Sequence, residues 1–190
     1  HNPPKRVASG IPHVTARGVR PDGSIDLHSG TYVSEQGFEQ TARRYRPTAG
    51  DVIVTCVGTI GRVAVVPTGV VFSADRNLAA IRVDTSKVMP EYVALALRGV
   101  GLQHKLAIAS GSTAQPHLYL RDLRALEIDI PDAVDQLEVI RTAEGHIGAN
   151  RLLVRELDKV LLRSTSLRRS LLETAFSGRL VKRTPAEELV

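Results

Sequence analysis

The chain has 190 residues, an ordinary apolar fraction and one cysteine, so an internal disulfide, a cysteine-rich zinc site and wholesale disorder are excluded. A net charge of +5 favours a polyanionic partner, and the excess lies mainly before Pro131, where 15 lysines and arginines face 11 aspartates and glutamates. No apolar run reaches the ~18 residues of a membrane-spanning helix and no signal-peptide core is present, so we expect a cytoplasmic protein without a membrane partner.

Residues 1–131 predict a globular domain of strands and short helices. Valine- and isoleucine-rich runs separated by closely spaced turns indicate antiparallel strands. Helices are predicted over Pro90–Arg98 and Leu102–Ala109, and a single turn over Leu118–Leu123. The fold class is therefore α+β, with a small, strongly curved, mostly antiparallel sheet. The predicted strands are Asp51–Val57, Arg62–Val66, Val70–Phe72, Leu78–Val83 and Ala125–Ile130.

Residues 132–178 predict one long helix that ends near Phe176, followed by a tail over residues 179–190. Asp132 or Asp135 is suited to cap its start, and Gly178 stands where a C-terminal cap belongs. About 45 residues correspond to roughly 65 Å of helix, far longer than a typical globular helix.

The long helix carries apolar residues at a seven-residue step, which predicts pairing with another helix in a coiled coil. The alternative is a helix lying on its own domain, but a domain of roughly 130 residues cannot cover that length. Gly145 and Gly148 weaken the helix locally, and we interpret them as a bend or a close approach of the partner. The predicted helix-pairing residues are Ile140, Ile147, Asn150, Val154, Leu157, Leu161 and Leu171.

No catalytic or cofactor-binding pattern is present in the sequence. None of the six histidines has metal-ligand spacing, and Cys56 lies within an apolar run, which is typical of a buried residue. Gly58–Gly61 lacks the lysine of a phosphate-binding loop and is interpreted as a tight turn, as is Asp75–Asn77. We therefore expect a protein that is not an enzyme, with no metal and no cofactor of its own.

Three polar or basic segments of the globular part favour contact with double-stranded DNA: Thr15–Arg20, Thr41–Arg46 and His104–His117. Arginine pairs with guanine and glutamine with adenine, while lysine, serine and threonine hold phosphates. Each segment taken singly is also compatible with an ordinary solvated loop. The candidate DNA-binding residues are Arg17, Arg20, Arg43, Arg44, Lys105, Ser112, Thr113, Gln115 and His117.

Several phrases, taken in order, resemble the specificity subunits of Type I restriction-modification systems, and the resemblance covers nearly the whole chain. The phrases are Tyr32–Ser34, Tyr45–Val54, Val57–Pro67, Phe72–Arg82, Gly111–Leu118, Leu126–Pro131, Asp135–Gln136 and Leu171–Leu180.

The resemblance implies two target-recognition domains per subunit and two long helices that pair antiparallel and set the spacing of a bipartite DNA target. It also implies methyltransferase subunits that hold S-adenosylmethionine, and a restriction subunit that carries nuclease and motor activity. This chain contains one domain and one helix, so we expect half of such a subunit. It is then a natural half subunit that forms a homodimer, a truncated form, or a fragment of a C-terminal half.

The alternative interpretation is a coiled-coil adaptor that assembles proteins without contacting DNA. It explains the long helix but leaves the basic excess of the globular part unexplained. An independent enzyme is disfavoured because no acid–base or metal set is recognisable in the sequence.

Overall fold

The computed structural model describes residues 3–28, 30–111 and 116–180. Strand β4 (Val52–Thr55) forms the centre of the fold, and all four of its residues are buried. It pairs antiparallel with β5 (Val63–Val65) on one side and with β7 (Leu78–Ile81) on the other. A strand rich in β-branched residues suits this position because both of its faces are covered.

A second sheet has the order β1-β3-β2-β6, formed by β1 (Arg6–Val7), β3 (Tyr32–Val33), β2 (Ile11–Val14) and β6 (Ser73–Ala74). Its pairs are antiparallel except β2 with β6. Helix α1 (Glu35–Ala42) packs beside β3 and β6. The α+β class and the mostly antiparallel pairing are confirmed, but the strands form two small sheets where one was expected.

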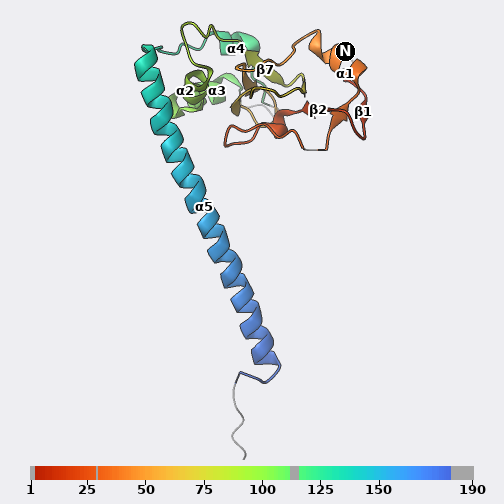
Figure 1. Ribbon diagram of the computed structural model, residues 1–190, viewed down its shortest axis with the longest axis vertical. Helices are drawn as coiled ribbons and strands as arrows, with labels where there is room; N and C mark the ends of the chain where they lie inside the picture. Colours follow the sequence, from red (N-terminus) through yellow and green to blue (C-terminus); the bar gives the residue numbers. More distant parts are fainter. Residues whose placement is uncertain (1–2, 29, 112–115, 181–190) are drawn as a thin grey trace, which may run out of the picture. The chain divides into compact units, whose positions relative to one another are not determined.

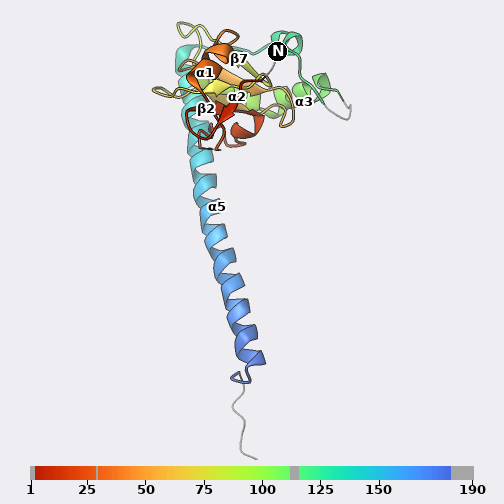
Figure 2. The same cartoon turned by 90° about the vertical axis from the view of Figure 1, so that its right-hand side faces the viewer.

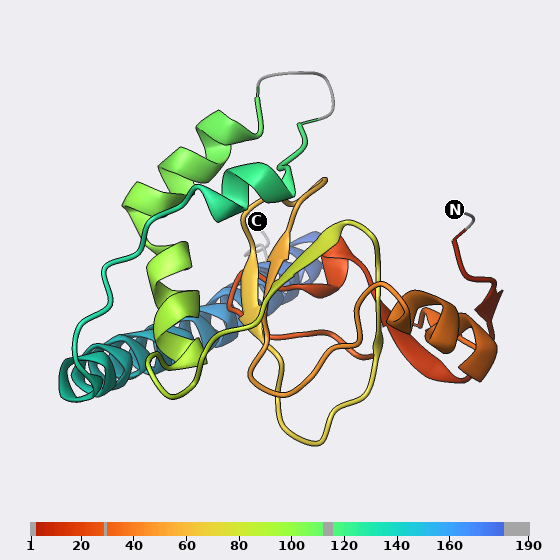
Figure 3. The ribbon, with the colours of Figure 1, turned by 90° about the horizontal axis from the view of Figure 1, so that it is seen from above.

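Helices α2 (Pro90–Arg98) and α3 (Val100–Ala109) lie together on one side of the β4 sheet, as the green helices in Figure 3 show. Val52 and Val54 of β4 belong to the apolar cluster that these helices complete. Ile53 points the opposite way, into a cluster with residues of the first strands. Because successive side chains of a strand point to opposite faces, β4 contributes residues to both apolar clusters.

Two predicted strands are wrong. Residues 70–72 are not a strand, and β6 begins immediately after them. Residues 125–130 have no strand partner among the described residues, although Leu126 and Ile128 pack against the core. Their apolar alternation reflects burial alone, without a neighbouring strand to pair with. The predicted turn of helix corresponds to α4 (Leu120–Arg124).

Helix α5 (Ala133–Phe176) is continuous for 44 residues, and its ribbon runs without a break in both side views (Figures 1 and 2). The Asp132 carboxylate caps its start by accepting the backbone N–H groups of Val134 and Asp135. Gly178 has a φ of 71° and its N–H donates to Ala175, which ends the helix in the left-handed conformation that glycine favours. The predicted helix and both caps are confirmed. The helix continues through Gly145 and Gly148.

The chain divides into two compact units, residues 1–141 and 142–190, so the first turns of α5 belong to the globular unit. Gln136 and Ile140 are the residues of α5 that are buried. Gln136 accepts the Met89 N–H at 2.8 Å and donates to the carbonyls of Lys87 and Pro131 at 3.1 and 2.9 Å. A single amide therefore fastens the start of the helix to the loop before α2. Burial also leaves Ile140 little surface for a partner helix, in contrast to the other predicted pairing positions.

Asp51 is a buried carboxylate at the start of the β4 sheet, 3% exposed. It accepts hydrogen bonds from the Tyr45 hydroxyl, from the N–H and hydroxyl of Thr48, and from the Arg82 guanidinium. Burial by itself raises the pKa of this carboxyl, but the hydrogen bonds from Arg82, Thr48 and Tyr45 outweigh it and lower the pKa to about 2. Burial and the hydrogen bond to Asp51 raise the pKa of the Tyr45 hydroxyl, so this hydroxyl keeps its proton and donates a hydrogen bond to Asp51.

Replacing Gln136 by Ala should lower the free energy of unfolding by about 3 kcal/mol, because the buried Gln136 side chain is lost and three backbone groups lose the hydrogen bonds that it makes. The variant Gln136→Glu should be at least as destabilising, since a carboxylate cannot donate to the Lys87 and Pro131 carbonyls. Urea unfolding measures both. The matched control is Glu138→Ala, an exposed position on the same turn, expected within about 0.5 kcal/mol of the wild type. If Gln136→Ala and this control were equally stable, the Gln136 amide would not be what fastens the start of α5 to the domain.

Asp51 should make stability depend on acid pH. Its pKa is about 2 when folded against an ordinary 3.8, so its contribution is present above pH 3.8 and is lost as the pH falls through about 2. The variant Asp51→Asn should be less stable at pH 7, and the gap to the wild type should narrow between pH 4 and pH 2. Urea titrations at several pH values test this, with Asp158→Asn on the exposed face of α5 as control. A gap that does not change with pH would disprove it.

Candidate nucleic-acid interface

Three hollows of the globular unit adjoin one another. The central groove, of about 620 Å³, is lined by residues of β1, η1 (Ala16–Gly18) and the turns after β4 and β6. The side pocket, of about 360 Å³, shares Gly58 and Thr59 with it and reaches α3. The basic pocket, of about 260 Å³, shares Asp75 with the central groove and contains Arg44 and Arg76. The central groove thus shares lining residues with each of the other two hollows, and we call the three together the reading band.

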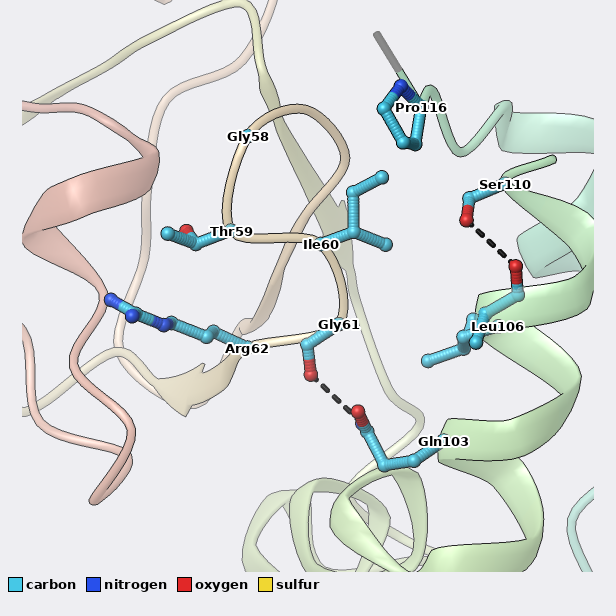
Figure 4. A pocket seen from close by; sticks show the side chains of 10 residues that line it. Gly58, Thr59, Ile60, Gly61, Arg62, Gln103, Leu106, Ser110 and Pro116 are labelled. Carbon is cyan, nitrogen blue, oxygen red and sulfur yellow. Dashed lines mark hydrogen bonds between the residues drawn. The ribbon is translucent and has the colours of Figure 1, made fainter. Parts of the chain in front are cut away.

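The turn between the central groove and the side pocket is held on both sides. The Thr59 hydroxyl donates to the Ala16 carbonyl at 2.9 Å, and the Arg62 guanidinium donates to the Val19 carbonyl at 3.1 Å. The Gln103 amide of α3 donates to the Gly61 carbonyl at 2.8 Å. Figure 4 shows Arg62 pointing toward η1 and Gln103 approaching from the opposite side. Gly58 and Gly61, with φ of 76° and 79°, permit this tight turn.

The positive charge of the central groove is only partly offset by its carboxylates. Asp26 already pairs with Arg20 at 2.9 Å, and that hydrogen bond lowers the pKa of Asp26. Asp75 is partly buried, and burial by itself raises the pKa of its carboxyl. Hydrogen bonds from the His13 ring and the Asn77 N–H have the larger effect, so the pKa lies below its ordinary value. The guanidinium groups of the groove's own arginines, Arg6 and Arg17, make no hydrogen bond or ion pair with the part of the chain that the structure describes. Two guanidiniums thus remain available for an anionic ligand.

The predicted DNA-binding residues divide into those that are available and those already used within the fold. Arg17 lines the central groove and Arg43 is exposed at the end of α1. Arg20 is bound to Asp26, and the Arg44 guanidinium donates to the carbonyls of Ala74 and Asp75, so these two arginines help to hold loops.

Only part of the third predicted segment, His104–His117, lines the reading band. Lys105 is exposed on α3 but lines none of the three hollows, whereas Ser110 and Pro116 line the side pocket. His117 is exposed and forms a β-bridge with Val57 of the groove, and its ring centroid lies 4.5 Å from that of Tyr119, with the two rings tilted. The predicted residues Ser112, Thr113 and Gln115 lie outside the described residues.

Sequence reasoning missed several lining residues of the band: Arg6, Thr59, Arg76 and Asn77. Arg6 belongs to a two-residue strand, and Arg76 and Asn77 to a segment interpreted as an ordinary turn. Short polar turns are so common that no local signal separates these from others. The pairing of β2 with β6 brings Asn77 into the groove that Arg17 also lines.

The described residues contain no group of three or more histidine, cysteine, aspartate or glutamate side chains that could hold a metal ion. Cys56 is buried, as predicted, and burial raises the pKa of its thiol. Within the same residues, no helix combines the length and the apolar character needed to cross a membrane.

The family profile described as Type I restriction modification DNA specificity domain matches residues 13–152, which include the whole reading band except its first residues. The chain belongs to this family. The resemblance stated from the sequence phrases is therefore confirmed, and so is the assignment to a family of specificity subunits.

Two curated relatives of this specificity domain are similar along much of the chain. The Type I restriction enzyme EcoBI specificity subunit of Escherichia coli is 26% identical over 166 residues, which cover 87% of this chain and 35% of that protein. A putative type I restriction enzyme specificity subunit of Haemophilus influenzae is 27% identical over 124 residues, covering 62% of this chain and 30% of that protein. The chain thus spans about a third of the length of these relatives.

Solved structures show the same fold. A chain from a structure that describes complex assembly of the type I R-M system superposes with a TM-score of 0.68 at 18% identity, over 90% of this chain and 39% of that chain. The HsdS subunit from Thermoanaerobacter tengcongensis gives a TM-score of 0.57 at 16% identity, over 98% and 46%. The arrangement of one α+β domain followed by a long helix is therefore shared with these structures.

Proposed function

We propose that this chain reads one half of a bipartite DNA target for a Type I restriction-modification complex. The observation that carries the proposal is the family match over residues 13–152, and the charge of the reading band supports it. Since the chain spans about a third of its curated relatives, the second half-site requires another reading domain, from a second copy or from a further half of the subunit.

The physical basis of DNA binding is a recessed, cationic surface presented by rigid turns. DNA carries a dense row of phosphates, and each phosphate that an arginine neutralises releases counterions, which favours binding. Arg6, Arg17 and Arg43 are suited to these contacts, because none of their guanidinium groups makes a hydrogen bond or ion pair with the described part of the chain. Sequence choice then comes from side chains that reach the base edges.

Helix α5 is proposed to hold the reading domain at a set distance from the second one. Its apolar row is exposed to solvent, with Val154, Leu157, Leu161 and Leu171 between 51% and 64% exposed. Such a row is costly unless another helix covers it, so antiparallel pairing with a second long helix is expected. Ile147 and Asn150 extend the same row toward the domain.

The methyl transfer and the DNA cleavage are assigned to partner subunits. We place S-adenosylmethionine on the methyltransferase subunits and nuclease activity on the restriction subunit, so that this chain contributes recognition without catalysis. Such a complex acts on DNA in the cytoplasm. The adaptor alternative is not favoured, since it leaves the unpaired arginines of the central groove without a ligand.

The variant Arg17→Ala should weaken DNA binding on all sequences and reduce its salt dependence. Loss of one phosphate contact lowers the slope of log K against log salt concentration by about 0.9 on duplex DNA. Binding should be measured by fluorescence anisotropy on the chain assembled with its methyltransferase subunits, at several salt concentrations.

The matched control is Lys87→Ala, which removes the same charge from an exposed side chain that lines none of the three hollows. Its slope should stay close to that of the wild type. If the assembled wild-type complex has no affinity for DNA at low salt, DNA reading is wrong and the adaptor interpretation stands. If it binds and both variants change the slope equally, the central groove is not the contact site.

A further inference from the structure

The loop Asp75–Asn77, called here the 75–77 loop, lies between two arginine-lined hollows. Asp75 lines both the basic pocket and the central groove, Arg76 lines the former and Asn77 the latter. Arg6 and Arg17 flank the loop on the groove side. An element flanked on each side by cationic recesses matches the cross-section of a DNA groove, whose floor of base edges is bordered by two phosphate strands.

The main chain of this loop is unusually well fixed. The Asp75 N–H donates to Val14 at 2.9 Å, and the Leu78 N–H donates back to Asp75 at 3.1 Å. The Asn77 carbonyl accepts the Cys56 N–H at 2.8 Å, while its N–H is bound by the Asp75 carboxylate. The Arg44 guanidinium holds the Asp75 carbonyl from outside at 2.8 Å. The loop therefore needs no ordering when a ligand arrives.

The side chains of Arg76 and Asn77, in contrast, are not committed. Arg76 is exposed and Asn77 is partly exposed, and neither side chain makes a hydrogen bond or ion pair with residues 3–28, 30–111 or 116–180. Asn77 also carries the one amide among the described residues that line the central groove. Three other polar side chains of the groove are already occupied, Asp26 by Arg20, Asp75 by His13 and Thr59 by Ala16.

We propose that the 75–77 loop is the base-reading element of this chain, with Asn77 and Arg76 as specificity-determining residues. An asparagine amide donates to N7 and accepts from N6 of adenine in the major groove, and an arginine donates to O6 and N7 of guanine. Arg6 and Arg17 then hold the adjacent phosphates. The inference rests on the proposed function, because it names the residues that would carry DNA reading.

The experiment selects preferred duplexes from a pool with a randomised half-site, using the chain assembled with its methyltransferase subunits. Asn77→Ala should lose about 10- to 100-fold of the preference for adenine at one position, the range of one bidentate contact. Asn77→Asp should lose it too and turn toward cytosine, whose amino group a carboxylate accepts. Arg76→Ala should relax a guanine at a nearby position in the same way.

Two controls make the outcome decisive. Gln36→Ala removes an exposed amide of α1 that lines none of the three hollows, and should leave every preference unchanged. Arg17→Ala should weaken binding on all duplexes without altering the selected sequence. Thermal unfolding checks that each variant folds; should Asn77→Ala fail this check, Asn77→Asp and Arg76→Ala carry the test.

The results separate the two proposals. A wild-type complex that selects no sequence overturns the proposed function. A wild-type complex that selects a sequence which Asn77→Ala, Asn77→Asp and Arg76→Ala all keep overturns the reading role of the 75–77 loop while leaving the proposed function standing. A uniform loss of affinity with unchanged preference would make both residues phosphate contacts and likewise overturn it.

Discussion

The complete burial of β4 is the constraint on which the rest of the domain depends. Val52 and Val54 complete one core and Ile53 the other, so the strand cannot shift by a residue without exposing apolar groups on both faces. The main chain that follows β4 also fixes loops at the surface of the domain. The Cys56 N–H binds Asn77 and the Cys56 carbonyl accepts the Leu118 N–H, so two loops distant in sequence hang from the same main chain. The loops that line the reading band are therefore held in place by the main chain that continues from the buried strand β4.

The class of fold and the long helix could be predicted from the sequence, because both follow from local patterns of residues. The seven-residue apolar step, the cap at Asp132 and the glycine at 178 are readable without tertiary contacts. The strand expected over residues 125–130 fails for the opposite reason. Leu126 and Ile128 do pack inward, but pairing requires a neighbouring strand, and that neighbour is a property of the whole fold.

The candidate site was only partly predictable for a similar reason. An arginine offers the same local signal whether it meets a ligand or a carbonyl of its own chain, so Arg20 and Arg44 could not be told apart from Arg17. The parallel pairing of β2 with β6 decides which side chains meet, and it joins residues some 60 positions apart. Family membership narrows the chemistry to DNA specificity, whereas the choice of residues comes from the three-dimensional arrangement.

The separation between backbone and side chain in the 75–77 loop has a consequence for how the protein changes over generations. Its shape comes from main-chain groups and from Asp75, so the two neighbouring side chains can be exchanged with little effect on folding. Under the proposed role of this loop, a single nucleotide change in the gene alters the target without an intermediate that fails to fold. A scaffold of this kind would let a lineage adopt new targets in small, viable steps.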